Sequence, residues 1–108
     1  MKSKVILGAR VKQADRIELL KLCNEFTNNL NFNDFNGVVN LQIANKNYVL
    51  QHIKELKNLL YFDPVLVSVH EKIKFLKRDI EFIKNTEKIN IINKLYELIG
   101  GAAYEKIY

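Results

Sequence analysis

The amino-acid sequence predicts a small, mostly helical α+β domain with a β-strand at its N-terminal end. Residues 4–11 alternate apolar and polar side chains, which is the period of a strand with one buried face. Most of the chain after residue 13 repeats its apolar residues every three to four positions, which is the period of a helix. The length of 108 residues suits one hydrophobic core. With no linker or internal repeat, we expect a single domain over residues 1–108.

The N-terminal strand is predicted over about residues 4–11, and its buried face would hold four apolar residues, Val5, Leu7, Ala9 and Val11. A second short strand is expected over about residues 38–43, where Val39, Leu41 and Ile43 alternate with amide side chains. An early start of the following helix is the alternative there. Because two strands alone are marginally stable in water, the first should pack on the helices or pair with the same strand of a second copy.

Four helices are predicted, over about residues 13–30, 46–61, 64–84 and 87–99. The apolar face expected for the first helix consists of Ile17, Leu19, Leu20, Cys23, Phe26 and Leu30. The third helix has the most regular spacing, and its inward residues are Leu66, Val69, Ile73, Leu76, Ile80 and Ile83. That spacing is typical both of a coiled-coil seam and of a long helix that packs within its own bundle.

Polar residues stand before three of these helices and can cap their first turns. Asn45 or Asn47 is expected to cap the second helix, and Thr86 the fourth. Asp63 followed by Pro64 is typical of a helix start, because Asp accepts hydrogen bonds from the free amides and Pro lacks a donor that would go unsatisfied.

Positive charge is concentrated in the first twelve residues. The net charge is +5, and this segment holds four cations and no acid: Lys2, Lys4, Arg10 and Lys12. The other 13 of the 17 basic residues are nearly balanced by the 12 acidic ones. A short basic segment suits a polyanion, although charges on an edge strand also oppose aggregation. We therefore predict that these four residues bind nucleic acid.

The strand KVILGARV, which runs directly into the helix at Gln13, resembles the opening of ribbon-helix-helix DNA-binding proteins. The resemblance implies a homodimer in which the strands of two copies pair and enter the major groove of DNA. It also implies that the groove-facing positions are Lys4, Ile6, Gly8 and Arg10.

No arrangement of residues predicts catalysis, so we expect a protein that is not an enzyme and that binds no metal or cofactor. Cys23 lies on an apolar helix face, where a thiol is buried and unreactive. His52 and His70 lack a cysteine or carboxylate at ligand spacing and are expected to be ordinary surface residues. A single cysteine allows no disulfide within the chain, and no stretch approaches the ~20 apolar residues of a membrane helix. We expect a soluble, cytoplasmic protein without a membrane partner.

Two functions follow from these observations. The first is DNA binding through the basic N-terminal strand. The alternative is a helical protein-binding module, such as an immunity protein, an antitoxin or a phage-encoded inhibitor. The heptad-like third helix favours the alternative, and so does a predicted protein interface in the C-terminal tail, made of Tyr104, Ile107 and Tyr108.

Overall fold

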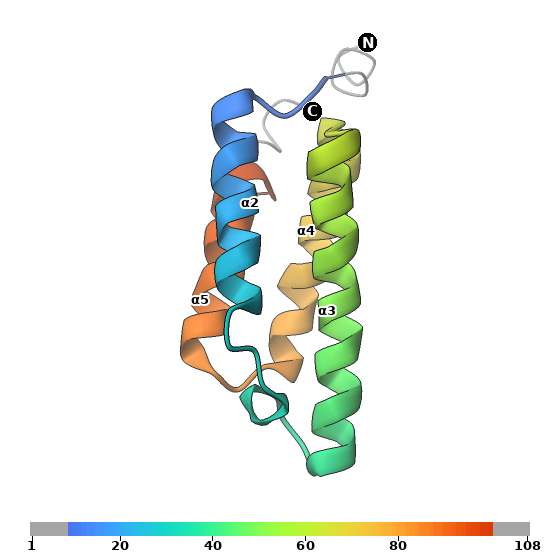
Figure 1. Cartoon of the computed structure of the whole chain (residues 1–108), viewed down its shortest axis with the longest axis vertical. Coiled ribbons are helices and arrows are strands. Elements are labelled where there is room, and N and C mark those ends of the chain that lie inside the picture. Colours follow the sequence, from blue (N-terminus) through green and yellow to red (C-terminus); the bar gives the residue numbers. More distant parts are fainter. Residues whose placement is uncertain (1–8, 101–108) are drawn as a thin grey trace.

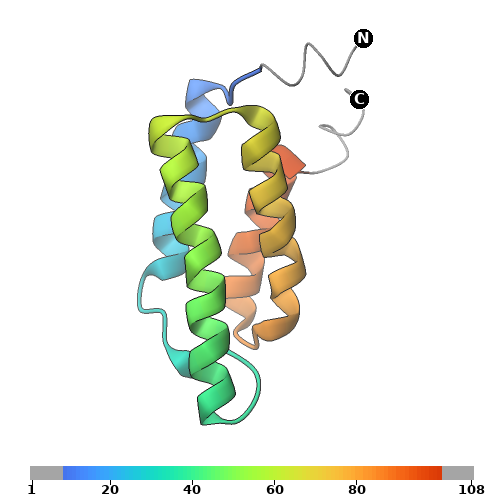
Figure 2. The same cartoon turned by 90° about the vertical axis from the view of Figure 1, so that its right-hand side faces the viewer.

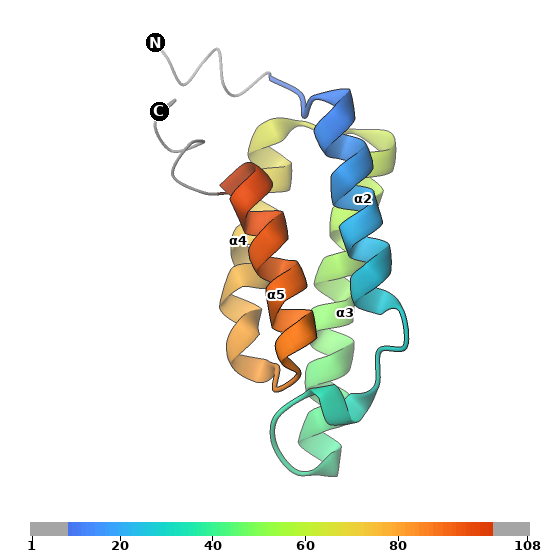
Figure 3. The same cartoon turned by 90° about the vertical axis from the view of Figure 1, so that its left-hand side faces the viewer.

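The computed structural model describes residues 9–100, and over that range it is an antiparallel bundle of four helices (Figure 1). The helices are α2 (Gln13–Thr27), α3 (Val39–Phe62), α4 (Leu66–Asp79) and α5 (Thr86–Leu95). They run alternately down and up the bundle, so each packs beside its neighbours in the sequence, and α5 closes the bundle against α2 (Figure 3). Short connections between consecutive helices favour this arrangement.

Three short helical turns complete the described part of the chain. They are the 3-10 turns η1 (Phe32–Asp34) and η2 (Ile80–Phe82) and the π-helical turn η3 (Tyr96–Gly100). The turn η2 continues α4 and η3 continues α5. The positions of the helices predicted over 64–84 and 87–99 are therefore confirmed. The C-terminal end of the first is a 3-10 turn, and that of the second is a π-helical turn.

The hydrophobic core runs along the centre of the bundle and takes side chains from all four helices. Its largest fully buried side chains are Phe26, Phe35, Leu19, Ile53, Leu56, Leu60, Ile73, Leu76, Ile92 and Leu95. Phe35 comes from the connection between α2 and α3, and this residue forms an isolated backbone bridge with Ile83. The connection is therefore part of the core at one end of the bundle.

The apolar face expected for the first helix is confirmed only in part. Leu19, Cys23 and Phe26 are fully buried, but Ile17 is exposed and Leu22 is buried in its place. The buried residues form an i, i+3, i+4, i+7 stripe that starts at Leu19, and Ile17 falls on the opposite side of that stripe.

The strand predicted over residues 38–43 is wrong, because α3 begins at Val39. Val39, Leu41 and Ile43 are all exposed, so their alternation does not mark a buried sheet face. Gln42 instead faces the core and donates a hydrogen bond from Nε2 to the carbonyl of Phe35, at 2.8 Å. The alternative of an early helix start is the correct one.

The α+β fold class is also wrong for the described residues, which contain no strand. Of the strand predicted over 4–11, residues 9–11 pair with the connection between α3 and α4 and with the first residue of α4, whose amide donates to the carbonyl of Ala9 at 2.8 Å. Arg10 forms an isolated antiparallel bridge with Val65, and Val11 donates to the carbonyl of Pro64 at 2.9 Å. The available partner is a short connection, which limits the pairing to a single bridge. The rest of the predicted strand lies outside the described residues.

The predicted helix caps are corrected as well. Asp63 ends α3, and its carboxylate accepts from Arg10 rather than from the first amides of α4. Asn85, one residue before Thr86, caps α5 by accepting from the amides of Glu87 and Lys88. Asn45 and Asn47 lie within α3, so neither residue caps a helix.

Candidate functional site

The first turns of α3 project beyond the other three helices at one end of the bundle (Figures 1 and 2). This end carries an exposed group of apolar side chains, which we call the apolar tip: Phe32, Val38, Val39, Leu41 and Ile43. The four aliphatic members are between 43 % and 71 % exposed. Within α3, Val39 and Ile43 share one side and Leu41 lies on the opposite side, because positions two apart in a helix do not face each other. The exposed apolar side chains therefore surround this end of the bundle, and their number exceeds the scattered single residues that protein surfaces ordinarily carry.

The apolar tip is almost free of charge. Asp34 is the one charged residue in the sequence from Asn28 to Asn45. Its carboxylate is already engaged, because Oδ1 accepts from the side chain of Asn85 at 2.9 Å and Oδ2 from the amide of Asn31 at 3.0 Å. The exposed surface of the tip is thus apolar and amide-rich.

Amide side chains hold the base of the tip in place. Asn36 donates from Nδ2 to the carbonyl of Glu81 and from its backbone amide to the carbonyl of Phe82, both at 2.9 Å. Asn45 donates from Nδ2 to the carbonyl of Asn36 at 3.3 Å. These bonds tie the connection before α3 both to η2 and to α3 itself. The asparagine-rich stretch of the sequence therefore builds a closed end of the bundle.

Gly37 provides the change of direction that starts α3. Its φ is +102°, in the region that residues with a Cβ rarely adopt. A Cβ at this position would lie 3.0 Å from Cβ of Leu41, which is closer than ordinary side-chain contacts. The approach of Leu41 to the Gly37 backbone thus depends on the missing side chain.

Four ring side chains lie where α3 packs against α4 and η2, and we call them the aromatic seam: Tyr48, His52, Phe75 and Phe82. Leu41 and Tyr48 are seven residues apart and share one face of α3, so the tip and the seam adjoin. Tyr48 meets the ring of His52 edge-on at 4.7 Å and that of Phe82 at 5.8 Å, and Phe75 stacks on His52 at 5.7 Å.

His52 of the seam pairs with a buried aspartate. His52 Nδ1 is 2.5 Å from Asp79 Oδ2, and their side chains are 14 % and 4 % exposed. Burial raises the pKa of Asp79, and the hydrogen bond from His52 opposes that rise. The pair joins the middle of α3 to the last residue of α4, where a buried carboxylate would otherwise lack a partner. Its role in this structure is to connect the two helices.

Cations border the seam on the α4 side. The Lys72 ammonium lies 5.3 Å from the centre of the Phe75 ring, and the Arg78 guanidinium carbon lies 5.7 Å from it. Lys72 also donates to Glu55 Oε1 at 2.5 Å, which lowers the pKa of that glutamate. Both cations are placed as in a cation–π pair, and Phe75 is still 39 % exposed.

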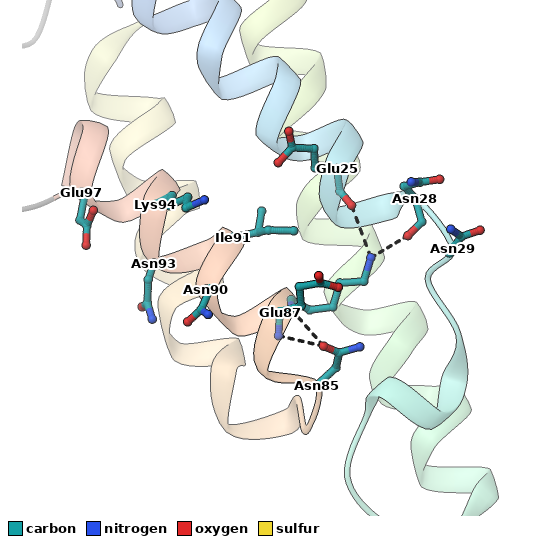
Figure 4. Close-up of a pocket in the computed structure, with 11 residues that line it drawn as sticks. Glu25, Asn28, Asn29, Asn85, Glu87, Asn90, Ile91, Asn93, Lys94 and Glu97 are labelled. Atoms are coloured by element: carbon teal, nitrogen blue, oxygen red, sulfur yellow. Dashed lines mark hydrogen bonds between the residues drawn. The ribbon is translucent and has the colours of Figure 1, made fainter.

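A polar groove of about 760 Å³ lies between the end of α2 and α5, on another side of the bundle (Figure 4). Its wall includes five asparagines, Asn28, Asn29, Asn85, Asn90 and Asn93, and three glutamates, Glu25, Glu87 and Glu97. Lys88 is the buried cation in this wall, and its ammonium donates to the carbonyls of Phe26 at 2.8 Å and Asn28 at 2.7 Å. These hydrogen bonds satisfy carbonyls at the C-terminal end of α2. The Lys88 ammonium is therefore already used within the chain and is not a free donor for a ligand in the groove.

The residues predicted to bind a partner are not brought to the apolar tip. Arg10 lies beside the C-terminal end of α3, whereas the tip surrounds the first turns of that helix; its guanidinium donates to the exposed carboxylate of Asp63 at 2.8 Å. Lys12 is exposed just before α2. The remaining predicted site residues lie outside the described part of the chain: Lys2, Lys4, Tyr104, Ile107 and Tyr108.

The expectation for Cys23 is confirmed, whereas those for the two histidines are wrong. Cys23 is fully buried, and burial raises its pKa to about 12. His70 is buried on α4, and the side chain of His52 is only 14 % exposed. Sequence spacing gave no signal for the burial of His52, because Phe75 and Asp79 come from another helix. For the tip, by contrast, the sequence does contain a signal, because the stretch around Val39, Leu41 and Ile43 is apolar and carries no charge.

Over residues 9–100, no group of three or more His, Cys, Asp or Glu side chains is placed to hold a metal ion. None of the described helices combines the length and the apolar composition needed to cross a membrane. In comparisons with known proteins, no family model, no curated protein and no solved structure matches this chain.

Proposed function

We propose that this protein is a non-enzymatic binding module that docks on a protein partner through the apolar tip. The observation that carries the proposal is the exposure of five large apolar side chains on one projecting end of the bundle. Their frame is held by the Asn36, Gln42 and Asn45 hydrogen bonds, so the surface is preorganised. A rigid apolar surface loses little conformational freedom on binding, which favours affinity.

A protein partner suits this tip better than a nucleic acid. The electrostatic part of nucleic-acid affinity comes from lysine and arginine that neutralise phosphates, and the tip contains neither. The basic residues that favour DNA binding are in the first twelve residues of the sequence and not in the tip. One of them, Arg10, already forms an ion pair with Asp63. DNA binding through the N-terminal segment is the competing proposal.

A protein partner also suits the tip better than a lipid surface. Membrane-binding helices combine an apolar face with an excess of cations that meet anionic headgroups. Near this end of the bundle, the cations Lys46 and Lys84 are balanced by the acids Asp34, Glu81 and Glu87. The local charge therefore does not favour an anionic bilayer.

The test is site-specific photo-crosslinking in cells that express the chain. A photoreactive amino acid replaces Leu41 in the tip or, as the control, Lys21 on the exposed side of α2. We expect a defined protein adduct from position 41 and none from position 21. The adduct at 41 should disappear when Val38→Asp is added three residues before it, on the same side of the chain, while the circular dichroism spectrum stays that of the parent.

Two results would contradict the proposal. One is an equal pattern of adducts from positions 41 and 21, which would mean that the tip is not a specific surface. The other is strong, salt-sensitive binding of duplex DNA that is lost in an Arg10→Ala/Lys12→Ala variant, with no adduct at the tip. That outcome would support the DNA-binding proposal instead.

A further inference from the structure

We propose that Asn36 is a site of spontaneous deamidation, which the hydrogen bonds at the base of the apolar tip slow and whose product opens that base. Three observations carry the proposal. The residue after Asn36 is glycine, the Gly37 amide makes no hydrogen bond within residues 9–100, and both residues are exposed between η1 and α3. The site itself is independent of the proposed function, whereas its effect on a partner rests on that function.

The sequence singles out one asparagine for this reaction. Deamidation begins when the backbone nitrogen of the following residue attacks the side-chain carbon Cγ of the asparagine. A Cβ on the following residue shields that nitrogen, and glycine has none. Of the 13 asparagines in the chain, Asn36 is the one followed by glycine. The local sequence therefore favours attack at this position over the other twelve.

The structure leaves the Gly37 nitrogen accessible. Among the residues that the structure describes, none accepts a hydrogen bond from the Gly37 amide. The amides that follow Asn45 and Asn47 are within α3, where the helix uses them as donors. Asn36 lies outside every helix, so its backbone is not held by a helical ladder and its side chain can turn toward the next residue.

The reaction consumes one water molecule and releases ammonia. The Gly37 amide gives its proton to hydroxide, and its nitrogen forms a bond to Asn36 Cγ. The Cγ–Nδ2 bond then breaks, and Nδ2 takes a proton from water and leaves as ammonia. Water opens the resulting cyclic imide at one of its two carbonyls. The product is aspartate or, when the main chain stays joined through the side-chain carbonyl, isoaspartate.

Hydrogen bonds at the base of the tip oppose this reaction. Asn36 Nδ2 donates to the carbonyl of Glu81 at 2.9 Å, and Asn45 Nδ2 donates to the carbonyl of Asn36 at 3.3 Å. Because Nδ2 leaves the chain in the reaction, its bond to Glu81 must open first. The bond from Asn45 holds the same residue in place, so the rate of deamidation follows the local opening of the base.

Either product removes the bond that ties the connection to η2. A carboxylate at position 36 has only acceptors, so an oxygen atom would face the carbonyl oxygen of Glu81. Isoaspartate also lengthens the main chain by a methylene group between Phe35 and Gly37, directly before the start of α3. The base of the tip then opens, and the preorganisation that favours partner binding is lost.

The first test incubates the folded chain at pH 8 and follows each asparagine by mass spectrometry of proteolytic peptides. Replacement of the amide nitrogen by oxygen raises the peptide mass, and chromatography separates aspartate from isoaspartate products. We expect Asn36 to react at least about tenfold faster than Asn33, which is also exposed in the connection between α2 and α3 but is followed by Asp34. Similar rates at the two positions would overturn the proposal.

Two matched variants test the protection by hydrogen bonds. Asn45→Ala removes the bond to the Asn36 carbonyl and should raise the rate at Asn36 about two- to fivefold. Asn47→Ala removes an exposed amide from the same helix and should leave the rate unchanged. Circular dichroism checks that both variants keep the fold. Equal rates in the two variants would contradict the protection that we propose.

The second test compares hydrogen exchange in the parent chain and in the separated product, by nuclear magnetic resonance. The Asn36 amide donates to the carbonyl of Phe82 at 2.9 Å in the intact base. We expect protection of the amide at position 36 to fall at least about tenfold in the product, while that of the fully buried Ile92 in α5 is kept. Unchanged protection at position 36 would show that the base stays closed and would overturn the proposal.

The inference and the proposed function can fail separately, because neither test involves a partner. If position 36 stays intact while position 41 forms its adduct, the inference is wrong and the proposed function stands. If the unmodified chain forms no adduct at position 41, the proposed function is wrong, and the deamidation site is judged by the two tests above.

Discussion

Replacing Lys88 by methionine removes the cation that closes the C-terminal end of α2 and keeps most of the apolar length of the side chain. Lys88 is buried, and its ammonium donates to the carbonyls of Phe26 at 2.8 Å and Asn28 at 2.7 Å. The same ammonium lies 5.7 Å from the centre of the Phe26 ring. Because the last carbonyls of a helix have no partner within it, the substitution leaves both acceptors without this donor.

The expected loss of stability follows from these two hydrogen bonds, because the third bond of the ammonium, to the Glu25 carbonyl, is long at 3.4 Å. A hydrogen bond from a charged group contributes about 1.5–3 kcal/mol net, and the bond to the Asn28 carbonyl is only partly buried. We therefore expect Lys88→Met to lower the free energy of unfolding by about 3 kcal/mol. For a domain of this size, that corresponds to a fall in Tm of roughly 10–20 °C.

Urea unfolding followed by circular dichroism at the helical band measures this change. The matched control is Lys94→Met, which removes a cation from the same helix and the same groove, at an exposed position. Surface substitutions of this kind usually change stability by less than about 0.5 kcal/mol. If Lys88→Met costs less than about 1 kcal/mol, or no more than Lys94→Met, the Lys88 ammonium does not close α2 in the way described.

Three further predictions concern the tip, the buried aspartate and the thiol. Gly37→Ala should destabilise the fold by about 1–2 kcal/mol, because alanine is strained at positive φ and its Cβ would crowd Leu41; thermal unfolding measures this, and an unchanged Tm would contradict it. Burial raises the pKa of Asp79, so its proton favours the folded state at low pH. This contribution is complete below the unfolded pKa of about 3.9 and declines as the pH rises through the higher folded value. Asp79→Asn should lack that decline, so its stability relative to the parent should increase between acidic and neutral pH in urea titrations; a difference independent of pH would refute the sign. Cys23, with a pKa raised to about 12, should react with a thiol reagent at pH 8 only after unfolding, and rapid labelling of the folded protein would show that it is accessible.

Local sequence patterns determined where most of the helices lie. The stripe from Leu19 to Phe26 and the regular spacing from Leu66 to Ile83 each place core residues on one side of a helix. Such a pattern is contained within one element, so it can be recognised without knowing the partner helices. The burial of Cys23 could be predicted for the same reason.

The start of α3 shows where local pattern was not enough. Val39, Leu41 and Ile43 alternate like a strand, and the sequence alone does not say whether these residues are buried. In the structure this stretch is the start of α3. Gln42 is buried and donates a hydrogen bond to the carbonyl of Phe35, and Val49, seven residues further on the same face, is buried in the core. Once the helix forms, the alternation leaves three aliphatic side chains in solvent, and the apolar tip results.

The contacts that define the candidate surface were decided by tertiary structure alone. His52 and Asp79 are 27 residues apart in the sequence, and Lys88 donates to carbonyls 60 and 62 residues earlier. No spacing of residues in the sequence predicts either contact, because each depends on which helices lie side by side and on how far they are shifted along the bundle axis. The sequence by itself determined the helical faces and the uncharged stretch, whereas packing determined which of those faces stayed exposed.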